Sequence, residues 1–404
     1  MWVPESARDI EARVSDRSLD ENAYFDAKRE LGSKNKDLAK DVAAMANNGG
    51  VLIYGIDEDE HKRPTKLAPV ILHGQRERVD AVVRMSIAPP PDIQIHEHPL
   101  EADPGRGYLV LVVPASPNAP HMVTAEKDNR YYQRLETQSV PMTEGEVARL
   151  YERRRRWDVD REQLLQEAIA CNHSIWLPAA ELADLHIMVR PVGVPNATLL
   201  EDAIGNGDAE HLLLNLIVGA RAAWRGPSYR PDLEPNWVMP RDSGWRIGSS
   251  PEETSHMQIV DLTISDDGRG YLFCGRAGGH ITSDQRFVII EDLIAGLTTR
   301  TLSILGGVYD AAKYFGPVDV GVAVTGLSGK SVYSLALINR GDIFLSQMVV
   351  PPLPRSEDYR RTERVTTASA LGADPRQIAR SLVARLIAQV TNGAYDPFGG
   401  RNAS

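Results

Sequence analysis

Residues 21–57 read ENAYFDAKRELGSKNKDLAKDVAAMANNGGVLIYGID, and this stretch decides the fold of the front of the chain. Residues 24–28 alternate like the two faces of a half-buried strand. Apolar side chains then recur from Leu38 to Ala46 with helical spacing, and Ser33 or Asn35 could cap the start of that helix. We therefore expect a strand that is followed directly by a helix.

The second half of the stretch predicts how the chain returns to the sheet. The sequence Asn-Asn-Gly-Gly at 47–50 supplies residues that adopt the left-handed conformation with which many helices end. The apolar run 51–56 predicts a buried strand with Asp57 at its C-terminal end. A helix between two such strands predicts a crossover unit, which would bring Asp57 beside Asp26 and Lys28.

Acidic side chains surround this unit together with one lysine. Asp26 and Lys28 are two residues apart, so they project from the same face of a strand. Converging carboxylates suit Mg²⁺ or Mn²⁺, and a neighbouring lysine can stabilise charge that develops on a phosphate. These residue types therefore predict metal-assisted phosphodiester cleavage. The competing interpretation is that they are surface charges on strand edges, and the spacing alone does not decide between the two.

Four blocks of sequence, taken in order, resemble the Schlafen AlbA-type domain: ENAYFDAK at 21–28, LAKDVAAMANNGGVLIYGID at 38–57, RYYQR at 130–134 and MTEGEV at 142–147. The resemblance covers roughly residues 15–155. It implies a three-carboxylate, metal-dependent site that cuts structured RNA such as tRNA. The matching residues here are Glu21, Asp26 and Asp57, with Lys28 beside them. Asp26 departs from the glutamate that is usual in the family, and its shorter side chain changes its reach toward a metal.

Composition places the chain among globular proteins with more than one domain. It has 404 residues, of which 42% are hydrophobic and 25% charged, and we divide it into domains at 1–156 and 157–404. Without a long apolar run or a basic, apolar N-terminus, neither a membrane span nor a signal peptide is expected. The two cysteines, Cys171 and Cys274, are too few for a zinc site and favour a reduced, cytoplasmic setting.

The net charge of −10 argues against a general affinity for nucleic acid, so any contact must use a local basic patch. A solvated helix face explains the lysines of that patch equally well. For Arg134, either binding a phosphate or holding the carboxylates in place is expected. The candidate nucleic-acid contacts are Arg29, Lys34, Lys36, Lys40, Arg130 and Arg134.

Four further features of the front domain carry expectations. Tyr131 and Tyr132 could stack on a base or fill the core, and the core is favoured. His96 and His98 alternate along an expected strand, but two histidines alone make a weak metal site. Thr143 and Glu146 have capping-box spacing and start a helix that we expect to end at Arg153–Arg156. The other elements expected here are helices at 5–19 and 75–87, a strand pair at 93–98 and 108–113, and a strand at 131–134.

The back half predicts an α+β domain of antiparallel strands and long helices, so the whole chain is α+β, with a mixed sheet and helices in front. Residues 326–331 resemble a phosphate-binding loop, but Val324 occupies the position of its first glycine, so no ATP is expected. The elements expected here are helices at 164–170, 209–224, 287–315 (interrupted near Gly306-Gly307) and 375–390, a strand at 185–191, a hairpin at 258–265 and 270–275, a strand pair at 318–325 and 332–338, and a strand at 359–367.

The leading hypothesis is a metal-dependent endonuclease of Schlafen-like type that acts on RNA in preference to DNA, in a defence role. The first alternative is a non-catalytic nucleic-acid-binding regulator in which the acids brace the fold. The second is a sensor or scaffold that binds a partner protein, or a second copy of itself, through residues 157–404.

Overall fold

The computed structural model describes residues 2–19, 21–59, 63–170, 182–193, 198–205, 208–233, 238–248, 259–280, 286–339, 353–354 and 357–399. The chain forms two compact units, Met1–Asp158 and Val159–Ser404. Each unit has its own sheet and its own hydrophobic core. The α+β class expected from the sequence is confirmed. Cys171 and Gln258 lie outside the described residues, whereas the thiol of Cys274 is free and buried.

The crossover unit predicted from residues 21–57 is present. Strand β1 (Phe25–Lys28) and strand β2 (Gly50–Tyr54) pair in parallel, and helix α2 (Asn35–Met45) connects them. The backbone N–H of Gly49, which has a φ of +83°, donates to the Met45 carbonyl and ends the helix. The predicted capping by Ser33 or Asn35 is wrong, because Lys34 occupies the N-cap and makes no side-chain cap.

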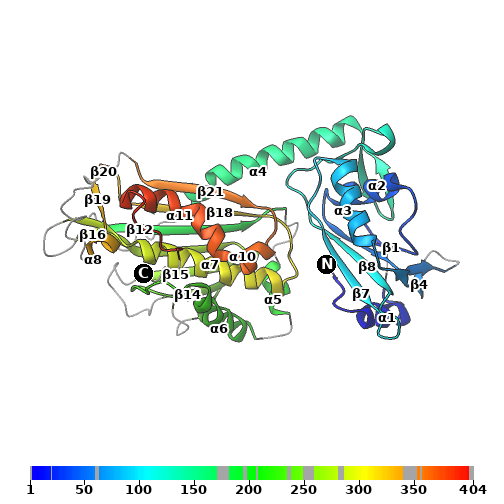
Figure 1. The fold of residues 1–404 in the computed structure, drawn as a ribbon, viewed down its shortest axis with the longest axis horizontal. Helices are drawn as coiled ribbons and strands as arrows, with labels where there is room; N and C mark the ends of the chain where they lie inside the picture. The colour runs from blue at the N-terminus through cyan, green and yellow to red at the C-terminus, as the bar shows by residue number, and fades with distance from the viewer. Residues whose placement is uncertain are drawn as a thin grey trace. The chain divides into compact units, whose positions relative to one another are not determined.

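Helices and strands of the front unit pack around β8 (Arg106–Val113), which pairs with β2 on one side and with β7 (Gln94–Pro99) on the other. Helices α2 and α3 (Gln75–Ser86) lie side by side and bury their apolar faces with this sheet (Figure 1). A second sheet has the strand order β11-β10-β9-β6. The other elements of this unit are α1 (Ala7–Ser15), β3 (Ile56–Glu58), β4 (Pro64–Leu67), β5 (Val70–Ile71), β6 (Ile87–Ala88), β9 (Met122–Val123), a 3-10 turn (Ala125–Lys127), β10 (Arg130–Leu135) and β11 (Gln138–Pro141).

The strand expected at 51–56 is interrupted, and this changes where Asp57 lies. Gly55 has a φ of +114°, and a Cβ atom there would lie 2.7 Å from the Tyr108 ring. The chain turns at this glycine, since side-chain-bearing residues rarely adopt such a φ. Strand β3 then pairs with β4 in a separate two-stranded sheet. Asp57 therefore belongs to a hairpin and does not continue strand β2.

The helix that begins after Thr143 is longer than predicted. The backbone N–H and hydroxyl of Thr143 donate to Glu146 at 2.8 and 2.9 Å, which confirms the capping box. Helix α4 then runs without a break from Glu144 to Ala170. The prediction that the arginines end it is wrong, because no glycine or proline follows them in the helix and residues 161–170 are mostly good helix formers.

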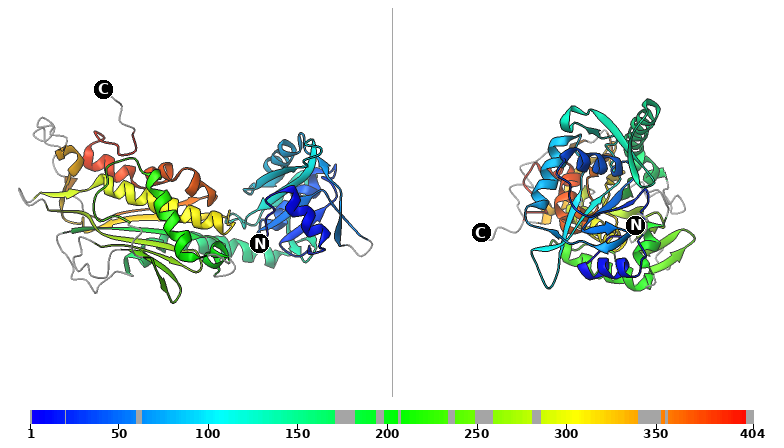
Figure 2. Two further views of the ribbon diagram at one scale, coloured as in Figure 1. Left: turned by 90° about the horizontal axis from the view of Figure 1, so that it is seen from below. Right: turned by 90° about the vertical axis from the view of Figure 1, so that its right-hand side faces the viewer.

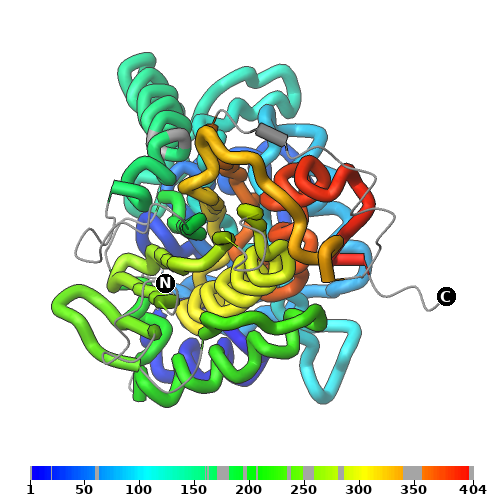
Figure 3. Tube along the Cα trace, turned by 90° about the vertical axis from the view of Figure 1, so that its left-hand side faces the viewer, coloured from blue at the N-terminus to red at the C-terminus, as the bar shows by residue number. Residues whose placement is uncertain are grey.

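The back unit places helices on one large, mostly antiparallel sheet with the strand order β13-β14-β15-β16-β12-β18-β21. Figure 2 shows α7, α10 and α11 as a layer over one face of this sheet, and Figure 3 shows α11 beside α7. The strands are β12 (Leu182–Pro191), β13 (Val238–Arg241), β14 (Gly244–Gly248), β15 (Val260–Ser265), β16 (Gly270–His280), β17 (Phe287–Ile289), β18 (Val318–Thr325), β19 (Ser331–Ser334), β20 (Leu353–Pro354) and β21 (Tyr359–Val365). The helices are α5 (Leu199–Ile204), α6 (Ala209–Ala220), a 3-10 turn (Arg221–Ala223), α7 (Glu291–Ala311), α8 (Leu335–Asn339), α10 (Ser369–Ala373) and α11 (Pro375–Thr391).

Three expectations for this unit are wrong. The strand expected at 332–338 ends at Ser334, and helix α8 follows it directly. The helix expected at 287–315 begins only at Glu291, after β17, and continues through Gly306-Gly307 without interruption. Strand β19 does not pair with β18; it lies parallel to β17, and β18 lies between β12 and β21. Among the described residues, no helix combines the length and the apolar character needed to cross a membrane.

Candidate functional site

Asp26 and Lys28 project from the same face of β1, as their spacing predicts. The Lys28 Nζ atom lies 3.2 Å from Asp26 Oδ2. On the other side of the carboxylate, Arg134 Nη2 of β10 lies 2.9 Å from Asp26 Oδ1, and the Arg134 side chain is only 3% exposed. Arg134 Nε also donates to the Asn22 carbonyl at 3.1 Å. Both oxygens of Asp26 therefore face a cation inside the protein.

Asp41 of α2 is a member of this site that the sequence prediction missed. Lys28 Nζ lies 3.3 Å from Asp41 Oδ2, and the Ser139 hydroxyl of β11 donates to Asp41 Oδ1 at 2.8 Å. The sequence contains a signal for it: Asp41 follows Leu38 by three residues, so it lies on the apolar side of the helix, where a buried charge needs a partner. We call Asp26, Lys28, Asp41 and Arg134 the buried charge network.

The network keeps Lys28 charged. Burial alone would lower the pKa of Lys28, but the charges of Asp41 and Asp26 raise it above its ordinary value, so Lys28 remains a cation. Tyr54 of β2 lies fully buried near these acids, and burial followed by the charges of Asp41 and Asp26 raises its pKa well above 10. Two carboxylates and two cations thus lie together: Asp26, Asp41 and Arg134 are buried, and the Lys28 side chain is 37% exposed.

Glu21 lies at the edge of the network. The backbone N–H of Ala27 donates to Glu21 Oε1 at 3.1 Å. Burial raises the pKa of Glu21 from 4.5 to about 7; the Ala27 hydrogen bond opposes the shift, and the charges of Asp26 and Glu58 add to it. The structure therefore brings Glu21 near Asp26, as predicted.

Asp57 is the acid that the structure does not bring to the network. Arg29 Nη1 lies 3.0 Å from Asp57 Oδ2, and the Glu58 backbone N–H donates to Asp57 Oδ1 at 3.1 Å. The turn at Gly55 puts Asp57 on the β3–β4 hairpin, and among the described residues the acids that pair with Lys28 are Asp26 and Asp41.

A divalent metal does not fit these residues in the arrangement described. Within the described ranges, no three His, Cys, Asp or Glu side chains are grouped as metal ligands. Lys28 and Arg134 already hold the oxygens of Asp26, and Arg29 holds Asp57. A metal at Glu21, Asp26 and Asp57 would have to displace these cations.

The predicted nucleic-acid contacts separate into surface and interior residues. Arg134 is buried and lies against the Asp26 carboxylate, which favours the role of holding the carboxylate over that of binding a phosphate. Arg29 and Arg130 are 68% and 64% exposed, and Lys34 is also exposed. Lys36 and Lys40 are partly exposed and lie near Asp128 and Asp37, at 3.1 and 3.8 Å.

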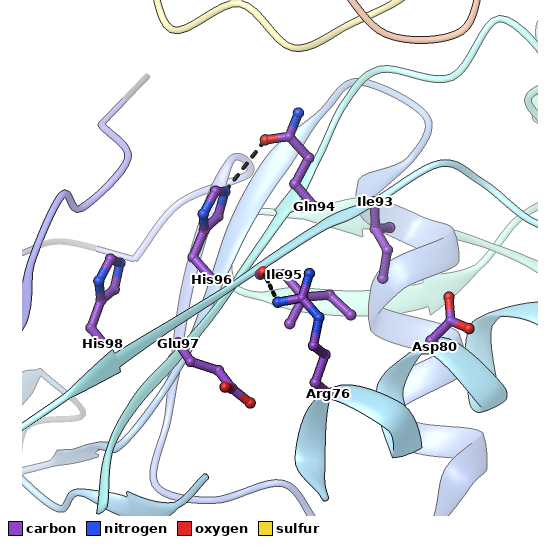
Figure 4. A pocket seen from close by; sticks show the side chains of 8 residues that line it. All are labelled: Arg76, Asp80, Ile93, Gln94, Ile95, His96, Glu97 and His98. Atoms are coloured by element: carbon purple, nitrogen blue, oxygen red, sulfur yellow. Dashed lines mark hydrogen bonds between the residues drawn. The ribbon is translucent and has the colours of Figure 1, made fainter. Parts of the chain in front are cut away.

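A pocket of about 710 Å³ lies along the edge strand β7 and helix α3. Figure 4 shows His96 and His98 projecting from one side of β7 and Arg76 and Asp80 facing it from α3. The two histidine rings are nearly parallel with centroids 6.4 Å apart, and burial lowers the pKa of both. None of the predicted site residues lines this pocket, so it is separate from the acids.

Residues 21–143 match the family model described as Schlafen, AlbA_2, which confirms the resemblance seen in the sequence. The chain thus carries a Schlafen AlbA_2 domain, of a family associated with nucleic-acid binding, and the rest of the chain is unassigned. Searches of the curated proteins and of the solved structures found no match.

Replacing Asp41 with Asn should destabilise the protein by about 1–3 kcal/mol, because Lys28 loses one of its two buried partners. Urea denaturation measures the change in the free energy of unfolding. Asp37→Asn is the matched control. Asp37 lies on the same helix, but its side chain is 60% exposed and its ion pair with Lys40 is long, at 3.8 Å. Equal effects of the two substitutions would contradict the network.

Glu21 should make the protein less stable as the pH rises. Between its ordinary pKa of 4.5 and about 7, the folded chain holds a proton that the unfolded chain has released, so stability is fully present below this window and falls through it. Glu21→Gln cannot ionise and should be more stable than the wild type above this window, by on the order of 1 kcal/mol after allowance for solvent.

Urea denaturation at pH values on either side of the window measures this effect. Glu97→Gln, which replaces an exposed acid of β7, is the control and should keep the pH dependence of the wild type. Unchanged pH dependence in Glu21→Gln would show that Glu21 does not cause it.

Proposed function

We propose that the front unit binds nucleic acid through its AlbA_2 domain and that the buried charge network braces the binding surface. The match of residues 21–143 to a family associated with nucleic-acid binding carries this proposal. The geometry supports the bracing role, since Lys28 and Arg134 neutralise Asp26 inside the protein. Cations outside the network remain available for phosphates.

Lys36 of α2 and Arg130 of β10 are the strongest candidates for these contacts. Their side-chain nitrogens lie 3.1 and 3.9 Å from Asp128 Oδ1, and the Asp128 side chain is 6% exposed. The Tyr132 hydroxyl also donates to Asp128 at 2.6 Å, which fixes the carboxylate in place. Two cations share one anion, so this part of the surface keeps a positive charge for a phosphate. Arg29, Lys34 and Lys40 are the further contacts that we propose.

The double substitution Lys36→Gln/Arg130→Gln should weaken RNA binding and reduce its salt dependence, because two phosphate contacts are lost. We expect the slope of log K against log salt to fall in magnitude by about 1–2. Fluorescence anisotropy with a labelled RNA at several salt concentrations measures this slope. Arg8→Gln, which removes an exposed cation from α1, is the control. An unchanged slope in the double variant would contradict the proposed surface.

Metal-dependent cleavage of structured RNA such as tRNA, in a defence role, is the second candidate function. One observation favours it. Burial and the charges of Asp26 and Glu58 raise the pKa of Glu21 to about 7, and a bound cation would stabilise the ionised carboxylate against both effects. This candidate requires the cations at Asp26 to leave, with Glu21, Asp26 and Asp57 as ligands and Lys28 at the phosphate. Residues 157–404 would then select the substrate or bind a protein partner or a second copy.

Cleavage is tested by incubating tRNA with the full chain and Mn²⁺, with Mg²⁺ in a parallel reaction. The second candidate predicts cut products with the wild type and with Asp37→Asn, and their loss in Asp57→Asn, because Asp57 is a proposed ligand and Asp37 is not. Absence of cutting by the wild type, or cutting that survives in Asp57→Asn, excludes this candidate and leaves nucleic-acid binding.

A further inference from the structure

Two tyrosines form a pair at the surface of the front unit. Tyr131 of β10 and Tyr151 of α4 have ring centroids 6.4 Å apart at an interplanar angle of 81°, and their hydroxyl oxygens lie 3.0 Å apart. The Tyr151 residue is 41% exposed, so part of its ring is open to a ligand. Tyr132, the next residue of β10, is buried, so the expected core role holds for one tyrosine of the two.

The attachment of α4 does not depend on this pair. Gln133 Nε2 of β10 donates to Glu146 Oε1 at 2.6 Å in the first turns of the helix. Further along, Arg153 Nη1 donates to Asn48 Oδ1 at 3.0 Å. The rings of Tyr131 and Tyr151 can therefore contact a ligand while other residues hold the helix.

The charge beside Tyr151 suits an anionic ligand. Arg155 follows Tyr151 by one helical turn, so both project from the same face of α4. Arg155 is exposed and forms no ion pair within the described part of the chain. The acid next to Tyr151 is Glu152, whose Oε1 atom lies 2.8 Å from Arg156 Nη2 and is neutralised by it. Tyr151, the exposed member of the aromatic pair, thus lies on the same face of α4 as the exposed cation Arg155.

We propose that Tyr131 and Tyr151 stack on the bases of unpaired nucleotides and that Arg155 contacts their phosphates. This inference rests on the proposed nucleic-acid binding and names its ligand as single-stranded or loop nucleic acid. Bases inside a duplex are already stacked, whereas every unpaired base offers a face to an aromatic ring. Aromatic rings combined with a cation are the usual means by which proteins hold single strands without reading their sequence.

The test compares an unstructured RNA of about 12 nucleotides with a duplex of the same sequence, using fluorescence anisotropy and the full chain. The wild type should prefer the single strand. Tyr151→Ala should weaken single-strand binding by roughly 10-fold, because a stacking ring is lost. Tyr151→Phe keeps the ring and loses only the hydroxyl contact, so it should bind as the wild type does.

Two results would overturn the stacking inference without affecting the proposed function. The first is single-strand binding by Tyr151→Ala equal to that of the wild type, and the second is a loss of affinity in Tyr151→Phe as large as that in Tyr151→Ala. In either case, weaker binding by Lys36→Gln/Arg130→Gln would leave the proposed function standing. A wild type that binds neither RNA overturns both. Thermal unfolding checks that each variant folds, and Tyr131→Leu, which should lose the same single-strand affinity, replaces Tyr151→Ala if that variant unfolds.

Discussion

The ion pair between Arg134 and Asp26 is the constraint on which the front unit depends. It joins β10 to β1, which are far apart in the sequence, and the Arg134 and Asp26 side chains are 3% and 4% exposed. A charge in such a place is costly unless it is paired, so removing one partner leaves the other uncompensated. Lys28 extends the pair to Asp41, and Ser139 extends it to β11. Four elements are thus held in register by one connected set of charges.

This arrangement also determines which side chains are available to bind a metal ion or a nucleic acid. Two of the three acids that first suggested a metal site pair with cations: Asp26 with Lys28 and Arg134, and Asp57 with Arg29. The surface functions that we propose for the unit use cations such as Arg130 and the Tyr131–Tyr151 pair, which β10 and its neighbours carry. Since Arg134 lies on the same strand, bracing its interior face also positions the residues that point outward.

Local patterns in the sequence were enough to predict the crossover unit, the helix end at Gly49 and the capping box at Thr143. The helix end and the capping box depend on residues within a few positions of one another, and the crossover unit follows from the strand and helix patterns of one continuous stretch. Sequence reasoning failed where the outcome depended on distant contacts. Gly55 sits in an apolar run that resembles an unbroken strand, and only its φ of +114° beside Tyr108 reveals the turn. The parallel pairing of β17 with β19 and the partner of Asp41 likewise join segments that no local spacing connects.

A double-mutant cycle on Asp26 and Arg134 measures their interaction directly. The unfolding free energies of the wild type, Asp26→Asn, Arg134→Met and the double variant would be compared by urea denaturation. A buried, mutually dependent pair predicts that each single change costs about 3–5 kcal/mol and that the double variant costs less than their sum by about 2 kcal/mol or more. Additive effects, with a coupling energy near zero, would contradict the claim that this pair holds the unit together.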